Sequence, residues 1–331
     1  MISDRLYNRS LQILTDADAH VTILAASYIL LINKTFDYDI LLKTLILLAS
    51  IAIFLSYIFF INDYFDMPYD VKAGKKRLVQ DIPKAYSIGI IIGMIVASIL
   101  LLWIISDLIY AALYFLTYVI GTFYSAPPVR FKTRHVLGIG ADILIEKTLP
   151  ILLIFTFFRY FEPDAILFLF AFSFLQLDII IHHQIEDYNG DMKAGIKTFV
   201  TMVGYYRALY LLQRFVQPLT GITLLLLCII ISININYTFI PGIAMLFIII
   251  YIYSMFSKNK LTRENKIQPV YISGLISYTI NVLPLYFALL LSMHYIPFIV
   301  LLLITLVSQY YIIHYYFKSF KNRNFPVLSS R

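Results

Sequence analysis

The stretch ILLKTLILLASIAIFLSYIFFINDYFDMPYD, residues 40–70, joins a long apolar run to a cluster of acids. Its apolar part, residues 40–62, reaches the length of about 20 residues with which a helix crosses a bilayer. Lipid leaves a spanning chain only helices or closed barrels, and this run is far too long and continuous for a barrel strand. The stretch therefore predicts a membrane-spanning helix with acids at its end.

The composition of the whole chain also indicates a membrane protein. Of its 331 residues, 60% are hydrophobic and only 14% are charged, whereas a soluble domain carries roughly 25% charged residues. A chain this apolar excludes a soluble globular protein of the same length. We expect a polytopic protein surrounded by membrane lipid, with no nucleic acid as a partner.

Ten segments of the chain are apolar enough to cross the bilayer. They are residues 20–35, 40–62, 85–106, 107–124, 137–158, 163–186, 206–232, 237–256, 272–292 and 295–317. Short polar or Pro/Gly turns separate most of them. We predict an all-α fold, a polytopic membrane helical bundle of nine to ten transmembrane helices that forms a single domain over residues 1–331.

Lys and Arg residues gather in alternate loops. Most of the 26 lie at the two ends of the chain or after the second, fourth, sixth and eighth spans, whereas the other loops hold only Lys34 and Arg159. The positive-inside rule places loops rich in Lys and Arg in the cytoplasm. We therefore expect both termini and the acids of residues 62–70 at the cytoplasmic face.

An acidic and then basic phrase occurs twice, as DMPYDVKAGKK (66–76) and DYNGDMKAGIK (187–197). The first copy ends the second predicted span and the second copy ends the sixth. Two four-helix halves in tandem, followed by C-terminal spans, would bring both copies to one membrane face. Internal repeats of this kind can build a site between two halves.

Each copy sets carboxylates at helical spacing beside Lys and Arg, and Pro68 is expected to bend or end the first helix. Like charges at this spacing repel unless cations lie among them. Hard divalent cations, typically Mg²⁺, bind carboxylate oxygens and keep positions for phosphate oxygens, while the basic side chains can meet the anion from the other side. At the mouth of a lipid-facing bundle, the pattern predicts a clamp for a diphosphate with an apolar tail.

Both copies also resemble motifs of a known family. NDYFDMPYD (62–70) resembles the NDxxDxxxD motif of the UbiA superfamily of intramembrane prenyltransferases, and DYNGDMKAGIKT from Asp187 resembles its second aspartate motif. YSAPPVRFK from Tyr124 is similar to the family's loop after the fourth span. The resemblance covers roughly residues 15–290 and leaves the predicted span 295–317 as an additional one.

The resemblance implies a Mg²⁺-dependent enzyme that moves the prenyl chain of an isoprenoid diphosphate to a lipophilic acceptor. The metal ligands that it implies are Asn62, Asp63, Asp66, Asp70, Asp187 and Asp191, with Asp66 and Asp187 central to catalysis. The side chains expected to contact the diphosphate are Lys75, Arg77, Tyr124, Arg130, Lys132, Lys193 and Lys197.

Charged residues inside the predicted spans are informative, because each costs about 2.5–3.5 kcal/mol at a helix centre. We predict that Lys147 pairs with Asp178 across two neighbouring helices and lines the cavity, either as part of catalysis or as a purely structural contact. Asp142 and Glu146 lie on the same span as Lys147, and these three residues together with Asp178 favour binding of an acceptor. The aromatic residues expected to shield a carbocation are Tyr57, Phe60, Tyr64, Tyr118 and Phe123.

Two other functions stay open. A terpene cyclase on the same scaffold would ionise the same diphosphate and let the cation close on itself. A cation transporter would use the acids in transit, although transporter sites lie near the membrane midplane rather than at one face. The acceptor class (a quinone precursor, an aromatic compound, an ether lipid or a carotenoid) and the prenyl length are left open by the sequence.

Overall fold

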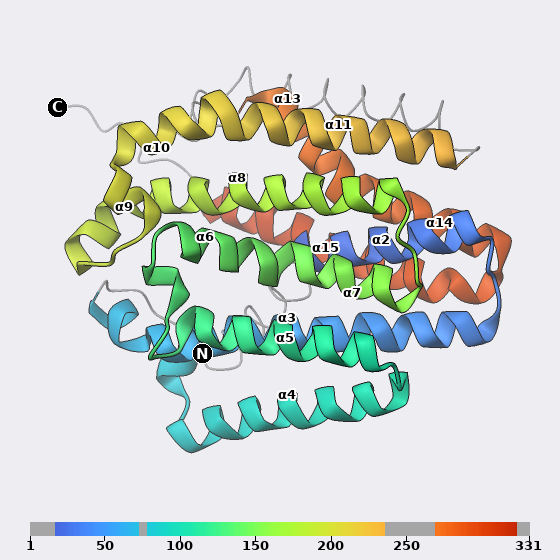
Figure 1. Cartoon of the computed structure of the whole chain (residues 1–331), viewed down its shortest axis with the longest axis horizontal. Coiled ribbons are helices and arrows are strands. Elements are labelled where there is room, and N and C mark those ends of the chain that lie inside the picture. Colours follow the sequence, from blue (N-terminus) through green and yellow to red (C-terminus); the bar gives the residue numbers. More distant parts are fainter. Residues whose placement is uncertain (1–16, 73–77, 236–268, 323–331) are drawn as a thin grey trace.

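The computed structural model describes residues 17–72, 78–235 and 269–322. These residues form helices joined by short connections, with no strand among them. Figure 1 shows the helices lying side by side in a bundle, with their long axes roughly aligned. The predicted all-α fold is confirmed.

The described helices follow the apolar runs of the sequence. They are α2 (Ala17–Asn33), α3 (Tyr38–Lys72), α4 (Lys84–Ile105), α5 (Leu108–Ser125), α6 (Val136–Ile143), α7 (Leu149–Phe157), α8 (Pro163–Ala194), α9 (Phe199–Val203), α10 (Tyr205–Leu211), α11 (Gln217–Asn234), α13 (Val270–Ser277), α14 (Leu283–His294) and α15 (Ile299–Asn322). Short 3-10 turns occupy Leu78–Asp81, Phe131–Thr133 and Ile296–Phe298.

Within the described residues, six helical segments are long and apolar enough to cross a membrane: Tyr38–Val71, Lys84–Ile105, Leu108–Ser125, Pro163–Glu186, Tyr205–Asn234 and Ile272–His294. Two shorter apolar helices, Ala19–Asn33 and Ile296–Tyr310, coincide with the first and last predicted spans. The predicted span 137–158 is helical as well. The predicted span 237–256 lies outside the described residues, so the total of nine to ten spans stays a prediction.

Helix α3 extends beyond the membrane-spanning length. Its 35 residues measure about 52 Å at 1.5 Å per residue, whereas the hydrocarbon core is about 30 Å thick. Pro68 was expected either to bend this helix or to end it. The helix does not end there but continues to Lys72. Arg130 contacts Asp66 on one side of this proline and the ring of Tyr69 on the other, which holds the last turns together.

Three π-helical turns, Leu144–Thr148, Leu212–Val216 and Tyr278–Val282, interrupt the helices of the described chain. After each π-turn, one residue intervenes before a proline: Pro150, Pro218 and Pro284. A proline donates no hydrogen bond and collides with the carbonyl four residues earlier. The wider π-turn relieves both problems, so the helical path continues past each proline.

The core lies among α2, α3, α7, α8 and α14, whose buried faces carry aromatic side chains such as Tyr28, Phe54, Phe155, Phe168 and Phe287. A smaller cluster packs α9 and α10 against the C-terminal part of α8. Helix α4 packs against α3 and lies at the edge of the bundle (Figure 1), with large apolar side chains exposed and only serines buried. This reversed pattern suits a helix that faces lipid.

The carboxylates of both copies of the repeated acidic phrase lie at one end of the bundle. Figure 1 shows the C-terminal ends of α3 and α8 and the connection from α5 to α6 at that end. The connections from α2 to α3 and from α7 to α8 lie at the opposite end, together with the ends of α11 and α14. The bundle therefore has two chemically different ends.

A close approach of α5 to α3 gives a test of this packing. A Cβ atom added at Gly121 would lie 2.6 Å from Ile58 Cγ2, and overpacking of this kind costs about 1–3 kcal/mol. We expect Gly121→Ala to lower the thermal unfolding temperature of the detergent-solubilised protein. Gly93→Ala on α4 is the matched control, because its Cβ would meet nothing within 4 Å. Equal unfolding temperatures for the two variants would contradict the packing described.

Candidate active site

A cavity of about 510 Å³ opens at the end of the bundle that carries the acidic phrases. Its walls come from α3, the end of α5, the α5–α6 connection, α6 and the π-turn after it, α8 and the segment after α8. The polar and charged residues that line it are Asn62, Asp66, Tyr69, Asp70, Tyr124, Arg130, Lys132, Thr133, Asp142, Glu146, His183, Gln184, Asp187, Asp191, Lys197 and Thr198. The cavity thus brings together side chains that are far apart in the sequence.

Helix α3 presents one row of oxygen ligands to this cavity. Asn62, Asp66 and Asp70 follow each other at intervals of four residues, so they share one helix face, and all three line the cavity. Asp63 lies about 100° around the helix from Asn62. It is only 3% exposed and is not among the residues that line the cavity.

Helix α8 supplies the facing row. His183, Asp187 and Asp191 repeat the interval of four residues, and all three line the cavity. The helix ends at Gly195, whose left-handed conformation (φ 68°) costs glycine little and turns the chain back. The turn carries Lys197 to the cavity wall.

The α5–α6 connection places two cations against Asp66. Arg130 donates from Nη2 to Asp66 Oδ1 at 2.9 Å, and its guanidinium lies 4.0 Å from the centre of the Tyr69 ring. Arg130 adopts a left-handed backbone conformation (φ 45°) that is unfavourable for a residue with a Cβ, and these contacts hold it there. Its Nε atom is buried and has no hydrogen-bond partner among the described residues.

Lys132 contacts the same oxygen ligands. Its Nζ donates to Asn62 Oδ1 at 2.9 Å and also to Asp66 Oδ1. Burial lowers the pKa of the Lys132 ammonium, and the Asp66 carboxylate opposes that shift. Ser125 donates to the same Asn62 oxygen at 2.6 Å, so the loop is tied to α3 at two consecutive turns.

A second acidic group lies on the α6 side of the cavity. Asp142 accepts hydrogen bonds from Tyr124 Oη at 2.9 Å and from Gln176 Nε2 at 2.7 Å. Gln176 Nε2 also donates to Glu146 Oε2 at 2.6 Å. The Tyr124 hydroxyl, which was expected to contact a diphosphate, is thus directed to Asp142. Sequence patterns did not indicate Gln176 or Tyr69, because neither carries a charge. Gln176 lies outside the repeated phrase, and Tyr69 lies within its first copy but has a glycine, Gly190, at the matching position of the second copy.

Several predicted site residues lie elsewhere. Lys147 and Asp178 are each 2% exposed and are not among the cavity-lining residues, which contradicts the expectation that they line it. Lys193 is exposed and does not line the cavity. None of the five aromatic residues expected to shield a carbocation lines it either; Phe59, Tyr69 and Tyr124 do. Lys75 and Arg77 lie outside the described residues.

The donor atoms of the cavity fit a hard divalent cation. Carboxylate and amide oxygens are the ligands that Mg²⁺ prefers, and it is usually bound by one or two carboxylates that leave positions for phosphate oxygens. Among the described residues, no group of three or more His, Cys, Asp or Glu side chains is close enough to hold a metal ion by itself. The arrangement therefore suits Mg²⁺ that shares its coordination with a bound anion, rather than a closed structural metal site.

Comparison with known proteins identifies relatives of this chain. The model of the UbiA prenyltransferase family matches residues 19–275. Two curated relatives from Humulus lupulus, a 2-acylphloroglucinol 4-prenyltransferase and its chloroplastic counterpart, are each 30% identical over 122 residues. Those matches span 33% of this chain and only 28% of the length of each relative.

Solved structures share the fold. A UbiA homolog from Archaeoglobus fulgidus superimposes with a TM-score of 0.57 at 20% identity, covering 86% of this chain and 99% of that one. Structures of a UbiA homolog from the same organism bound to DMAPP and Mg²⁺ or to GPP and Mg²⁺ give TM-scores of 0.54 and 0.53 over 83% of this chain. At this identity, the likeness extends to the arrangement of the helices.

The loop that carries Arg130 and Lys132 rests on a glycine of α6, which gives a test of its placement. A Cβ at Gly138 would lie 2.8 Å from the carbonyl oxygen of Phe131 and 3.0 Å from Lys132 Cα, whereas a Cβ at Gly140 would meet nothing within 4 Å. We expect Gly138→Ala to displace the loop and to weaken binding of inorganic diphosphate in the presence of Mg²⁺ by about 10–100-fold. Gly140→Ala should bind it like the unmodified protein, as isothermal titration can establish. Equal affinities would show that the loop's position does not matter.

Proposed function

The chain belongs to the UbiA prenyltransferase family, and we propose that it transfers the prenyl chain of an isoprenoid diphosphate to a lipid-soluble acceptor. One observation carries the proposal: carboxylates from α3 and α8 and cations from the α5–α6 connection line the same cavity. The combination suits a diphosphate, because the anion needs both a metal-binding face and a basic face. The helices supply apolar surroundings for the prenyl chain.

The residues proposed to hold Mg²⁺ are Asn62, Asp66 and Asp70 on α3 and Asp187 and Asp191 on α8. When bound, the metal would withdraw negative charge from the leaving diphosphate. The protein's part is to keep these oxygens on two facing rows. Asp63, which the family motif includes, is proposed as a buried supporting residue of the α3 row, because it does not line the cavity.

The residues proposed to bind the diphosphate directly are Arg130, Lys132 and Lys197. Arg130 retains a buried Nε donor that has no partner among the described residues, and a phosphate oxygen would satisfy it. Charge-assisted hydrogen bonds of this kind strengthen as charge builds on the leaving group. Lys75 and Arg77 are proposed as further contacts from the segment outside the described residues.

An acceptor is proposed to lie on the α6 side of the cavity. Asp142 and Glu146 both line it and can accept hydrogen bonds from hydroxyl groups. Ile58, Phe59, Ile145 and Ile180 form an apolar wall that would keep water from a carbocation. The acidic acceptor side favours transfer over cyclisation, because a cyclase has no second substrate to orient.

The cavity is proposed to open to the cytoplasm. Arg130, Lys132, Lys193 and Lys197 all belong to the end of the bundle that carries the cavity. The positive-inside rule places such an end on the cytoplasmic side. Labelling of a single cysteine introduced at Met192, which is 55% exposed, by an impermeant reagent in inverted vesicles would test this orientation.

Substitution of one carboxylate tests the metal row. We expect Asp187→Asn to lower Mg²⁺-dependent release of diphosphate from allylic diphosphates of increasing length by about 10²-fold or more, because one anionic ligand is lost. Glu186→Gln is the matched control, since this neighbouring acid is exposed and does not line the cavity. Equal losses in both variants, or none in either, would overturn the assignment.

The same assay separates the remaining functions. Transfer requires that prenylated product form only when a hydroxylated or quinonoid acceptor is added. A cyclase would give a cyclic hydrocarbon or alcohol with no acceptor present. Ion flux in liposomes without consumption of diphosphate would instead indicate a transporter.

Removal of the metal gives a further prediction. Treatment of the purified protein with EDTA should abolish turnover, and addition of Mg²⁺ should restore it, because the carboxylate rows repel a diphosphate that has no cation between them. Helix content should stay unchanged under EDTA, as circular dichroism can measure. Full activity in excess chelator would contradict a metal-dependent reaction.

A further inference from the structure

A second pocket, of about 780 Å³, lies at the opposite end of the bundle from the candidate active site. Helix α8 connects the two, because Asp164 in its first turn lines this pocket and Asp191 in its last turn lines the active-site cavity. At 1.5 Å per residue these two residues are roughly 40 Å apart along the helix. That distance exceeds the hydrocarbon thickness of about 30 Å, so the pocket belongs to the other membrane face.

A buried carboxylate forms one side of the pocket. Asp164 is 7% exposed, and its Oδ2 accepts hydrogen bonds from the hydroxyl groups of Tyr28 and Tyr160 and, at 3.1 Å, from Asn234 Nδ2. Its Oδ1 accepts from the backbone N–H of Ala165 at 2.9 Å. All of these donors are neutral, so the negative charge of Asp164 is held without a paired cation among the described residues.

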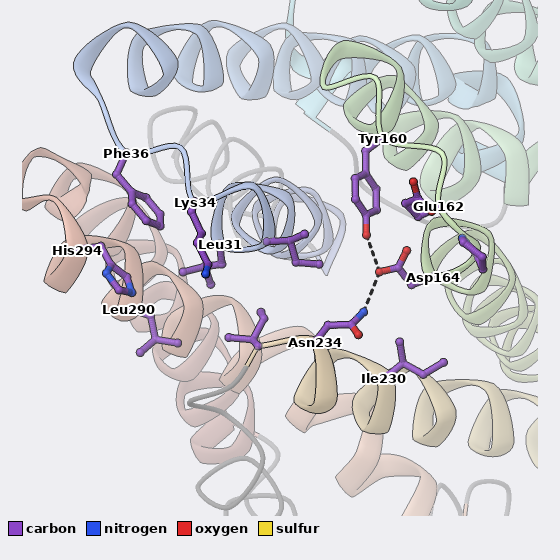
Figure 2. A pocket seen from close by; sticks show the side chains of 13 residues that line it. Leu31, Lys34, Phe36, Tyr160, Glu162, Asp164, Ile230, Asn234, Leu290 and His294 are labelled. Atoms are coloured by element: carbon purple, nitrogen blue, oxygen red, sulfur yellow. Dashed lines mark hydrogen bonds between the residues drawn. The ribbon is translucent and has the colours of Figure 1, made fainter.

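The other charges of the pocket are separated rather than paired. Figure 2 shows Glu162 and Asp164 on one side and Lys34 and His294 across from them. The side chains of Lys34 and Glu162 are exposed and make no hydrogen bond or ion pair with any residue of the described chain. Opposite charges that line one pocket without meeting leave room for a ligand that carries both signs.

The remaining walls are apolar. Leu31, Ile32, Ile230, Ile235 and Leu290 line the pocket between the charged groups. Beside it, Ile233 and Met293 are 58% and 74% exposed. Apolar exposure at this level next to a charged pocket is suited to contact with the acyl region of the bilayer.

We propose that this pocket binds the head group of a zwitterionic phospholipid with a primary amine, a phosphoethanolamine lipid of the membrane. The ammonium group would donate to Glu162 and Asp164, and the phosphate would accept from Lys34. His294, whose ring stacks on Phe36 at 4.8 Å, would border the phosphate. The acyl chains would leave along the apolar wall.

The charge pattern separates this lipid from other common lipids. A choline head group has no N–H to donate and is recognised by aromatic cages rather than by carboxylates. An anionic lipid would bring its head group toward the uncompensated carboxylates, and like charges repel. The pocket therefore selects for the primary amine.

The test uses the purified full-length protein in detergent and native mass spectrometry with ethanolamine, choline and glycerol phospholipids of the same acyl chains. We expect the ethanolamine lipid to bind about tenfold tighter than the other two. Glu162→Gln and Lys34→Gln should each reduce its affinity by about tenfold, since each removes one charge-assisted contact. Both residues are exposed, so neither variant should disturb folding, as the unfolding temperature will show.

Arg159→Gln is the matched control, because Arg159 is a cation at the same end that pairs with Asp107 at 2.5 Å and does not line the pocket. It should leave the preference unchanged. The proposal would be overturned if the three lipids bound equally or if the anionic glycerol phospholipid were preferred. It would also be overturned if the preference for the ethanolamine lipid persisted in Glu162→Gln and Lys34→Gln. If soluble glycerophosphoethanolamine bound as tightly as the ethanolamine lipid, this would contradict the proposal that the ligand is a lipid. Diphosphate turnover is measured in parallel and should be unchanged in these variants, so the outcome is independent of the proposed catalytic function.

Discussion

The contact of Arg130 and Lys132 with Asp66 is the interaction on which the active-site end of the bundle depends. It joins the α5–α6 connection to α3 in the middle of the row formed by Asn62, Asp66 and Asp70. A carboxylate row at a membrane boundary would otherwise repel itself, and the two cations compensate it. The same cations line the cavity, so the interaction that compensates the carboxylates is also suited to binding an anion.

Helix length determines what this end of the bundle can do. Helices α3 and α8 have 35 and 32 residues, longer than the roughly 20 residues that cross the hydrocarbon core. Their last turns can therefore carry carboxylates outside the apolar layer, where charge costs less. The first turn of α8 reaches the other face in the same way, so one helix contributes an acid to a pocket at each end.

Much of the fold was predictable because lipid leaves few alternatives. The apolar runs predicted the helices, and spacings of three and four residues predicted that Asp63, Asp66 and Asp70 share one face. Asp66 and Asp70 line the cavity together, whereas Asp63 does not. Other features depended on neighbours. Pro68 lies inside α3 although an isolated helix would tend to break there, since Arg130 holds the turns on both sides. Lys147 and Asp178 were expected on the cavity wall, but both are buried and do not line it, because the packing of neighbouring helices decides which face of a helix meets the cavity.

The sequence by itself determined the all-helical membrane fold, the two acidic rows and the family, because hydrophobic length and residue spacing are local properties. Only the tertiary structure decided which side chains meet. Lys132 and Arg130 contact Asp66, and the Tyr124 hydroxyl donates a hydrogen bond to Asp142. Asp63 is buried away from the cavity, and Lys34 and Glu162 border a second pocket. These contacts join residues from different helices, and their partners depend on how the helices pack and rotate, which no single segment of the sequence encodes.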